Sequence, residues 1–197
     1  KYVILSHAHG DHDQGVATLQ SKYGAHVVMG GPDWEDTRKR APGVAGGVPK
    51  RGPEDISVGP EGKKLTVGDT TIDIVFTPGH TVGTLSYVFP VKDKGKTVMV
   101  AYSGGTLTGA FGTDARRWDE YINSQKRIAA AAQAAGASVL LSNHSEYDNA
   151  YTKARLVTAK REVGEQNPFI VGADNVQNYF TVMEECATAS KLRNNAK

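Results

Sequence analysis

Four potential metal ligands stand within six positions near the start of the chain. They are His7, His9, Asp11 and His12. They follow an apolar segment at residues 2–5 that is typical of a buried strand, and side chains this polar are costly at a strand end unless they bind something. Imidazole nitrogen and carboxylate oxygen are ligands that zinc takes in catalytic sites. His7 and His9 lie two apart in an extended segment and can reach one ion. Asp11 and His12 lie beyond a glycine bend and can reach a second. The alternative is a polar loop with chance histidines, which we disfavour because the whole chain has only six.

Residues 7–12, with the sequence His-Ala-His-Gly-Asp-His, resemble the H-x-H-x-D-H signature of the metallo-β-lactamase fold superfamily. The resemblance implies an α/β fold, an αββα sandwich of two sheets with a metal site along one edge. We expect residues 1–197 to form a single metallo-β-lactamase-like domain. The strands that normally precede the motif, most of the family's first sheet, are not in the sequence. We therefore expect the domain to be N-terminally incomplete; the alternative is that a partner segment completes the sheet.

Two further histidines also follow predicted strands. Residues 64–76 alternate in the manner of a hairpin and lead into T-P-G-H-T, which contains His80. The apolar segment 139–141 leads into His144. Ligands gather where strand ends release loops in layered α/β proteins, although a single histidine there can also be structural. By the resemblance, T-P-G-H-T is the second signature element and His144 occupies the last ligand position.

The resemblance implies two metal ions with three protein ligands each. The first would be held by His7, His9 and His80, and the second by Asp11, His12 and His144. We expect two Zn2+ ions because nitrogen and oxygen ligands with an open position suit zinc. Iron or manganese is the alternative, since selectivity also depends on metal availability.

A carboxylate that many relatives carry is missing after another predicted strand, residues 97–102. The following residues 104–107 read Gly-Gly-Thr-Leu, where relatives such as glyoxalase II have G-D-T-L with an aspartate that bridges both metals. Gly105 cannot replace that aspartate. One subclass of metallo-β-lactamases manages without it and combines His-His-His and Asp-His-His sites with a serine-rich loop here. Thr106 and Thr108 fall where that subclass has hydroxyl residues near the substrate carboxylate; the alternative is that they are turn residues.

These features imply a dinuclear zinc hydrolase. A metal-bound water has a pKa of about 7, so a zinc-bound hydroxide is present at neutral pH and can attack a carbonyl carbon. Asp11 would orient this hydroxide as well as bind the second metal. The leading hypothesis is opening of the amide of a β-lactam ring, which would place the protein in the periplasm or outside the cell. The alternatives are a lactone, thioester or other ester hydrolase of the same fold, and a non-catalytic metal-binding relative.

Composition and charge limit the partners. With 39% hydrophobic and 22% charged residues, the 197-residue chain is typical of a globular protein. Its formal net charge of +2 gives no basis for binding nucleic acid or an anionic membrane, and no run of about 18 apolar residues could span a bilayer. We expect a small-molecule substrate with a hydrolysable carbonyl, and neither nucleic acid nor membrane as a partner.

The remaining patterns predict strands and helices in alternation. Residues 41–62 are rich in glycine, proline and charge, and we expect them to form a loop. We expect the C-terminal helix to be capped by Asp174 and to carry Cys186 on its buried face. Further strands are predicted at 26–29 and 84–90, and helices at 13–23, 33–40, 119–135, 151–163 and 174–193.

Overall fold

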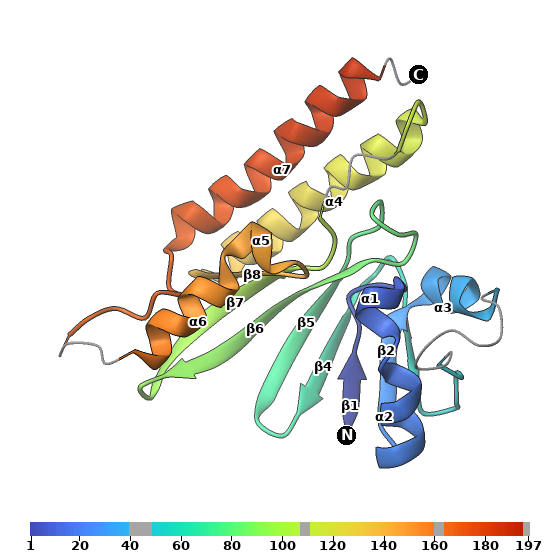
Figure 1. The fold of residues 1–197 in the computed structure, drawn as a ribbon, viewed down its shortest axis with the longest axis horizontal. Coiled ribbons are helices and arrows are strands. Elements are labelled where there is room, and N and C mark those ends of the chain that lie inside the picture. Colours follow the sequence, from blue (N-terminus) through green and yellow to red (C-terminus); the bar gives the residue numbers. More distant parts are fainter. Residues whose placement is uncertain (40–48, 107–110, 160–163, 195–197) are drawn as a thin grey trace.

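The computed structural model describes residues 1–39, 49–106, 111–159 and 164–194. In these residues two sheets pack against each other face to face, and helices flank them on both sides (Figure 1). The strands are β1 (Tyr2–Ile4), β2 (His26–Gly30), β3 (Ile56–Val58), β4 (Lys63–Val67), β5 (Thr70–Phe76), β6 (Leu85–Asp93), β7 (Lys96–Ser103) and β8 (Val139–Ser142). The helices are α1 (Gly10–Asp13), α2 (Val16–Tyr23), α3 (Gly31–Arg38), α4 (Ala115–Ala134), α5 (Ser145–Asp148), α6 (Ala150–Thr158) and α7 (Ala173–Arg193).

The two sheets differ in how their strands run. The first has the order β1-β2-β3 and is parallel throughout. The second has the order β4-β5-β6-β7-β8, antiparallel up to β7, with β8 parallel to β7. The strands β5, β7 and β8 therefore point the same way, so their carboxyl ends meet at one edge of the second sheet.

Three hydrophobic clusters lie between four layers. Side chains of β2, β3, β5 and β6 pack between the two sheets. Side chains of α2 and α3 pack on the outer face of the first sheet, and those of α4 and α7 cover the outer face of the second (Figure 1). Strand β2 contributes to both sides of the first sheet because successive strand residues face opposite ways: Val28 points between the sheets, whereas Val27 and Met29 point to the helices. The αββα arrangement implied by the motif is confirmed.

Two predictions in the first half of the chain were wrong in detail. The helix predicted at 13–23 is two helices, α1 and α2, and only the second ends as expected, at Gly24 with a φ of 60°. The segment 41–62 is not simply a loop, because β3 lies within it and Ile56 pairs with Val28 of β2. A strand of three residues is too short to show an alternating pattern. Residues 40–48 lie outside the described part of the chain.

The C-terminal half also differs from expectation at helix ends. Helix α4 begins at Ala115 rather than at 119. Gly172, with a φ of 90°, is the N-cap of α7, and Asp174 lies inside its first turn. Cys186 is exposed, so its predicted burial was wrong. The buried stripe of α7 passes beside it through Val176, Phe180, Met183 and Ala187. Among the described residues, no helix combines the length and apolar character needed to cross a bilayer.

Candidate metal centre

The loops after β1, β5 and β8 carry the predicted ligands, and the loop after β7 lies between them. Three of these strands end at the same edge of the second sheet. The loop after β1 belongs to the first sheet but is tied to the second by hydrogen bonds. The backbone N–H of Leu85 donates to the carbonyl of Ser6 at 2.7 Å, and the hydroxyl of Tyr87 donates to the carbonyl of Leu5. Both bonds fix the motif against β6.

We call His7, His9 and His80 the first triad. One ring nitrogen of each lies within 4.8 Å of the others. The Nε2 atoms of His7 and His80 are 3.2 Å apart. His7 is fully buried and His80 nearly so, whereas His9 is exposed. The structure thus brings together three predicted ligands that could hold one ion, with an opening on the His9 side.

A backbone carbonyl sets which nitrogen of His7 faces the triad. The Nδ1 atom lies 2.9 Å from the carbonyl oxygen of Gly104, which can only accept a hydrogen bond. Nδ1 therefore carries the proton, and Nε2 presents its lone pair to His80. A second bond that fixes the tautomer and the ring orientation in this way is usual for histidines that bind metals.

We call Asp11, His12 and His144 the second triad, whose ligand atoms also lie within 4.8 Å of one another. The Nε2 atoms of His12 and His144 are 3.3 Å apart, and Asp11 Oδ2 lies 3.2 Å and 3.8 Å from them. Burial lowers the pKa of His12, although Asp11 acts in the opposite direction. The ring centroids of His7 and His12 are 4.3 Å apart, so the two triads adjoin.

Burial keeps His7 and His80 of the first triad neutral. Burial, followed by repulsion from the three nearby histidines, lowers the pKa of His7 from 6.5 to about 2. Burial also lowers the pKa of His80 to about 4, with the backbone of Thr106 acting against it. The ring nitrogens of His7 and His80 face each other across 3.2 Å and those of His12 and His144 across 3.3 Å, so a cation could be bound by the nitrogens of each pair. The donor set therefore fits two divalent cations of the zinc type.

The loop after β7 leaves no room for a bridging side chain. A Cβ built at Gly105 would lie 2.6 Å from the Cβ of His80 and 3.0 Å from Cγ2 of Thr84. A Cβ at Gly104 would lie 1.6 Å from the carbonyl oxygen of Leu85. This loop thus packs so closely against the His80 segment that an aspartate at position 105 would not fit without a shift of its neighbours.

Thr106 borders a cavity beside the second triad. Its side chain is buried, and no group in the described part of the chain bonds its hydroxyl. Together with His144, Glu146 and Tyr147 it lines a cavity of about 420 Å3. The role of Thr106 in substrate binding stays a prediction, and Thr108 lies outside the described residues.

Asp33 is a site residue that the sequence did not reveal. It lies in the first turn of α3, fully buried, and accepts hydrogen bonds from Ala8, Thr81 and Gly83. Burial raises the pKa of this carboxyl, while the three hydrogen bonds oppose the rise. Its partners lie 25 to 50 residues away in sequence, and no local pattern marks such a contact.

Helix α4 supports the His80 segment from behind. Ser124 Oγ donates to the carbonyl of Pro78 at 2.7 Å, and the Tyr121 hydroxyl donates to the carbonyl of Gly105 at 3.3 Å. Gly79 has a φ of 128°, and a Cβ there would lie 2.6 Å from the Cα of Tyr121. Only glycine combines this φ with such close approach.

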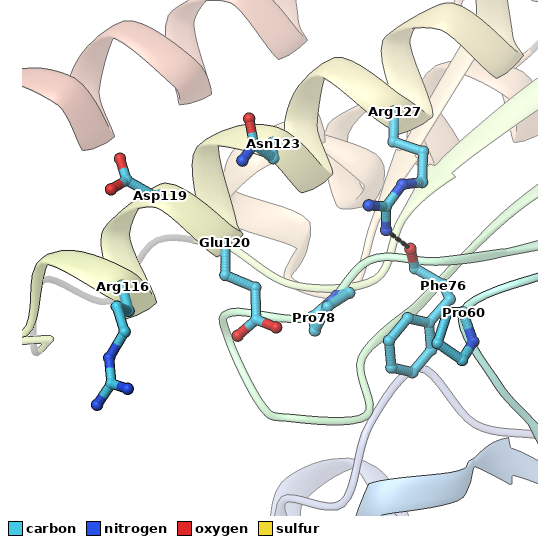
Figure 2. A pocket seen from close by; sticks show the side chains of 8 residues that line it. All are labelled: Pro60, Phe76, Pro78, Arg116, Asp119, Glu120, Asn123 and Arg127. Carbon is cyan, nitrogen blue, oxygen red and sulfur yellow. Dashed lines mark hydrogen bonds between the residues drawn. The ribbon is translucent and has the colours of Figure 1, made fainter.

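A second cavity of about 460 Å3 lies between α4 and the segment that leads to Pro78 (Figure 2). In it the guanidinium of Arg127 donates to the carbonyl of Phe76, which anchors the end of β5 to α4. No member of either triad lines this cavity. It is therefore separate from the candidate metal centre.

Comparison of this chain with known sequences finds similarity to the metallo-beta-lactamase superfamily. The family model described as the metallo-beta-lactamase superfamily matches residues 1–94. A hydroxyacylglutathione hydrolase of Rhodopseudomonas palustris (strain BisA53) is 30% identical over 205 residues, which cover 97% of this chain and 72% of the relative. Another, from Bradyrhizobium sp. (strain BTAi1), is 29% identical over 202 residues with the same coverage.

Solved structures agree with this assignment. BJP-1, a subclass B3 metallo-beta-lactamase of Bradyrhizobium japonicum, superposes with a TM-score of 0.74 and 27% identity, covering 98% of this chain and 73% of its own. FEZ-1 from Legionella gormanii has a TM-score of 0.77 at 19% identity, covering 99% and 75%, and supports the fold alone. From the motif, the layered fold and these similarities, the chain belongs to the metallo-β-lactamase superfamily.

Proposed function

We propose that this chain is a metal-dependent hydrolase that cleaves the thioester of an acyl-thiol substrate. The observation that carries hydrolysis is the meeting of two metal-ligand triads beside a cavity of about 420 Å3. The thioester is favoured because curated relatives that match 97% of the chain, at 30% and 29% identity, are hydroxyacylglutathione hydrolases.

The residues of the site would have separate roles in hydrolysis. Divalent cations in the two triads would supply Lewis-acid activation of water and of the substrate carbonyl. The Asp11 side chain is 63% exposed and can accept a hydrogen bond from the attacking water. The Thr106 hydroxyl can donate to a substrate oxygen, a bond of about 1.5–3 kcal/mol if that oxygen is charged. Thr108 remains a second candidate donor.

The leaving group also favours a thioester. A thiol has a pKa of about 8.5, so a thiolate can leave near neutral pH without a proton donor. An amide nitrogen leaves less readily unless it is protonated or otherwise stabilised. Burial lowers the pKa of His12, so this ring is a poor proton donor at neutral pH. A thiolate does not need a proton from this ring to leave.

A β-lactam is the second candidate substrate, and a specific observation favours it. Position 105 is glycine, and its surroundings would not admit the bridging carboxylate that glyoxalase II relatives carry. The likeness to a subclass B3 enzyme at 27% identity agrees with that feature. The Asp-His-His composition of the second triad is consistent with either substrate.

Turnover of a substrate panel tests the proposal. The zinc-loaded chain would be assayed with a hydroxyacylglutathione, an acyl-homoserine lactone, a penicillin, a cephalosporin and a carbapenem. We expect the highest kcat/KM for the thioester, and loss of that turnover in His80→Ala. A higher kcat/KM for any β-lactam would replace the thioester by the second candidate. Failure to turn over any of these substrates with both metals bound would contradict the thioester proposal.

A further inference from the structure

We propose that Asp33 is a positioning residue that holds together the two chain segments from which the first triad is built. This inference rests on the metal centre and not on the identity of the substrate. The three hydrogen bonds of Asp33 go to the Ala8 and Gly83 backbone and the Thr81 hydroxyl and not to a ligand ring, so their effect on metal binding would pass through the segments that they fix.

One carboxylate bonds both segments. Asp33 Oδ2 accepts the backbone N–H of Ala8 at 2.8 Å, and Ala8 stands between His7 and His9. The same oxygen accepts the hydroxyl of Thr81 at 2.8 Å, and Oδ1 accepts the backbone N–H of Gly83 at 2.7 Å. These two partners lie just after His80 in the chain. The single side chain therefore spans the loop after β1 and the loop after β5.

Only a carboxylate satisfies these three donors. An ionised aspartate accepts hydrogen bonds at both oxygens, whereas an asparagine amide accepts at one end and donates at the other. In the Asp33→Asn variant, either orientation of the amide would make at least one of the donors face an N–H₂ group. Buried donors left without an acceptor shift or lose their place, and the two segments would separate.

The packing around the carboxylate prevents it from adapting. Asp33 is fully buried. A Cβ built at Gly83 would lie 2.7 Å from Cγ of Asp33, and one built at Gly30 would lie 1.9 Å from the carbonyl oxygen of Gly83. The start of α3 and the loop after His80 thus approach at glycines on both sides. The surrounding backbone therefore fixes the position of the carboxylate. Loss of any of its three hydrogen bonds would act directly on the segments that carry the ligands.

The second triad has a different support. Asp148 Oδ2 accepts the backbone N–H of Ser142 at 2.7 Å, and Oδ1 accepts that of Ala150 at 2.8 Å, which fixes the loop that carries His144. The three hydrogen bonds of Asp33 all go to the other two ligand loops. The bond to Ala8 falls between two ligands of the first triad, whereas Asp11 and His12 lie three and four residues further along the same loop, in α1. We therefore expect loss of the Asp33 carboxylate to weaken metal binding more at the first triad than at the second.

Zinc titration in two single-site backgrounds tests this selectivity. His144→Ala leaves only the first triad intact, and His80→Ala leaves only the second. Adding Asp33→Asn to His144→Ala should raise the zinc Kd by about 10- to 100-fold, the range for loss of a group that orients a metal ligand. Adding it to His80→Ala should change the Kd by less than about threefold, because Asp11 and His12 lie in α1 and the His144 loop is held by Asp148.

Asp55→Asn is the matched control, because Asp55 also accepts two backbone N–H groups, those of Val27 and Gly52, but bonds neither ligand segment. It should lower the unfolding temperature without changing zinc affinity at either triad. Thr81→Val removes one donor and keeps the carboxylate, so it should weaken the first triad in the same direction even where Asp33→Asn does not fold.

The results that overturn the inference are equally specific. An unchanged Kd in the His144→Ala background, or an equal loss in both backgrounds, would reduce Asp33 to a structural residue. An effect of Asp55→Asn as large as that of Asp33→Asn would do the same. A wild-type chain that binds no zinc would remove the metal centre and this inference together, whereas zinc binding without thioester turnover would overturn the proposed function alone.

Discussion

At the scale of single residues, the candidate centre depends on imidazoles that burial keeps neutral. His7 is held by the Gly104 carbonyl so that Nε2 faces His80, and both rings have a strongly lowered pKa. The candidate metal ligands were predictable from the sequence because each follows a predicted strand. The tautomer and Asp33 were not predictable, since both depend on contacts between segments far apart in the chain.

The pH dependence of stability follows from these neutral rings. In the unfolded chain His80 takes up a proton below about pH 6.5, whereas in the folded chain it does so only near pH 4. The unfolded state therefore binds more protons, and the free energy of unfolding of the metal-free protein should fall as pH drops from 6.5 to 4. His7, with a pKa of about 2, extends the loss to lower pH.

Urea unfolding of the metal-free chain at about pH 7 and about pH 5 measures this effect. Asp33 has a raised pKa and so acts with the opposite sign, and the comparison with His80→Ala isolates the histidine. The fall in unfolding free energy should be smaller in the variant. Equal falls in both proteins would contradict the lowered pKa of His80.

At the scale of elements, strands that release ligand loops were predicted well, and connections were not. The alternation in β4 and β5 and the apolar runs of β1 and β8 are strong local patterns. Strand β3 was missed because its three residues owe their place to pairing with β2. The burial of Cys186 was predicted wrongly because neighbouring residues of a helix point in different directions. The buried residue is its neighbour Ala187.

Helix α4 is expected to stabilise the His80 segment through Ser124. Ser124→Ala would leave the carbonyl of Pro78 without its donor at a buried position and should lower the free energy of unfolding by about 1–3 kcal/mol. Chemical denaturation would measure the change. Ser21→Ala is the control, because Ser21 is exposed and its hydroxyl donates to the carbonyl of Thr18 within its own helix. Equal stabilities of the two variants would contradict a supporting role for α4.

At the scale of the whole molecule, the two sheets and the loops between them converge on the paired triads. The first sheet supplies the motif after β1, and the second supplies the loops after β5, β7 and β8 at one edge. The layered fold was predictable because its signature motif resembles that of a known family. The substrate was not, because a hydroxyacylglutathione hydrolase and a subclass B3 metallo-beta-lactamase both resemble this chain.

The zinc content of the chain tests this account most directly. Elemental analysis after dialysis against zinc-containing and then metal-free buffer at neutral pH should give two zinc ions per chain, one for each triad. His80→Ala and His144→Ala should each retain one. A wild-type chain without zinc, or variants that keep both ions, would contradict the assignment of His80 and His144 to two separate sites.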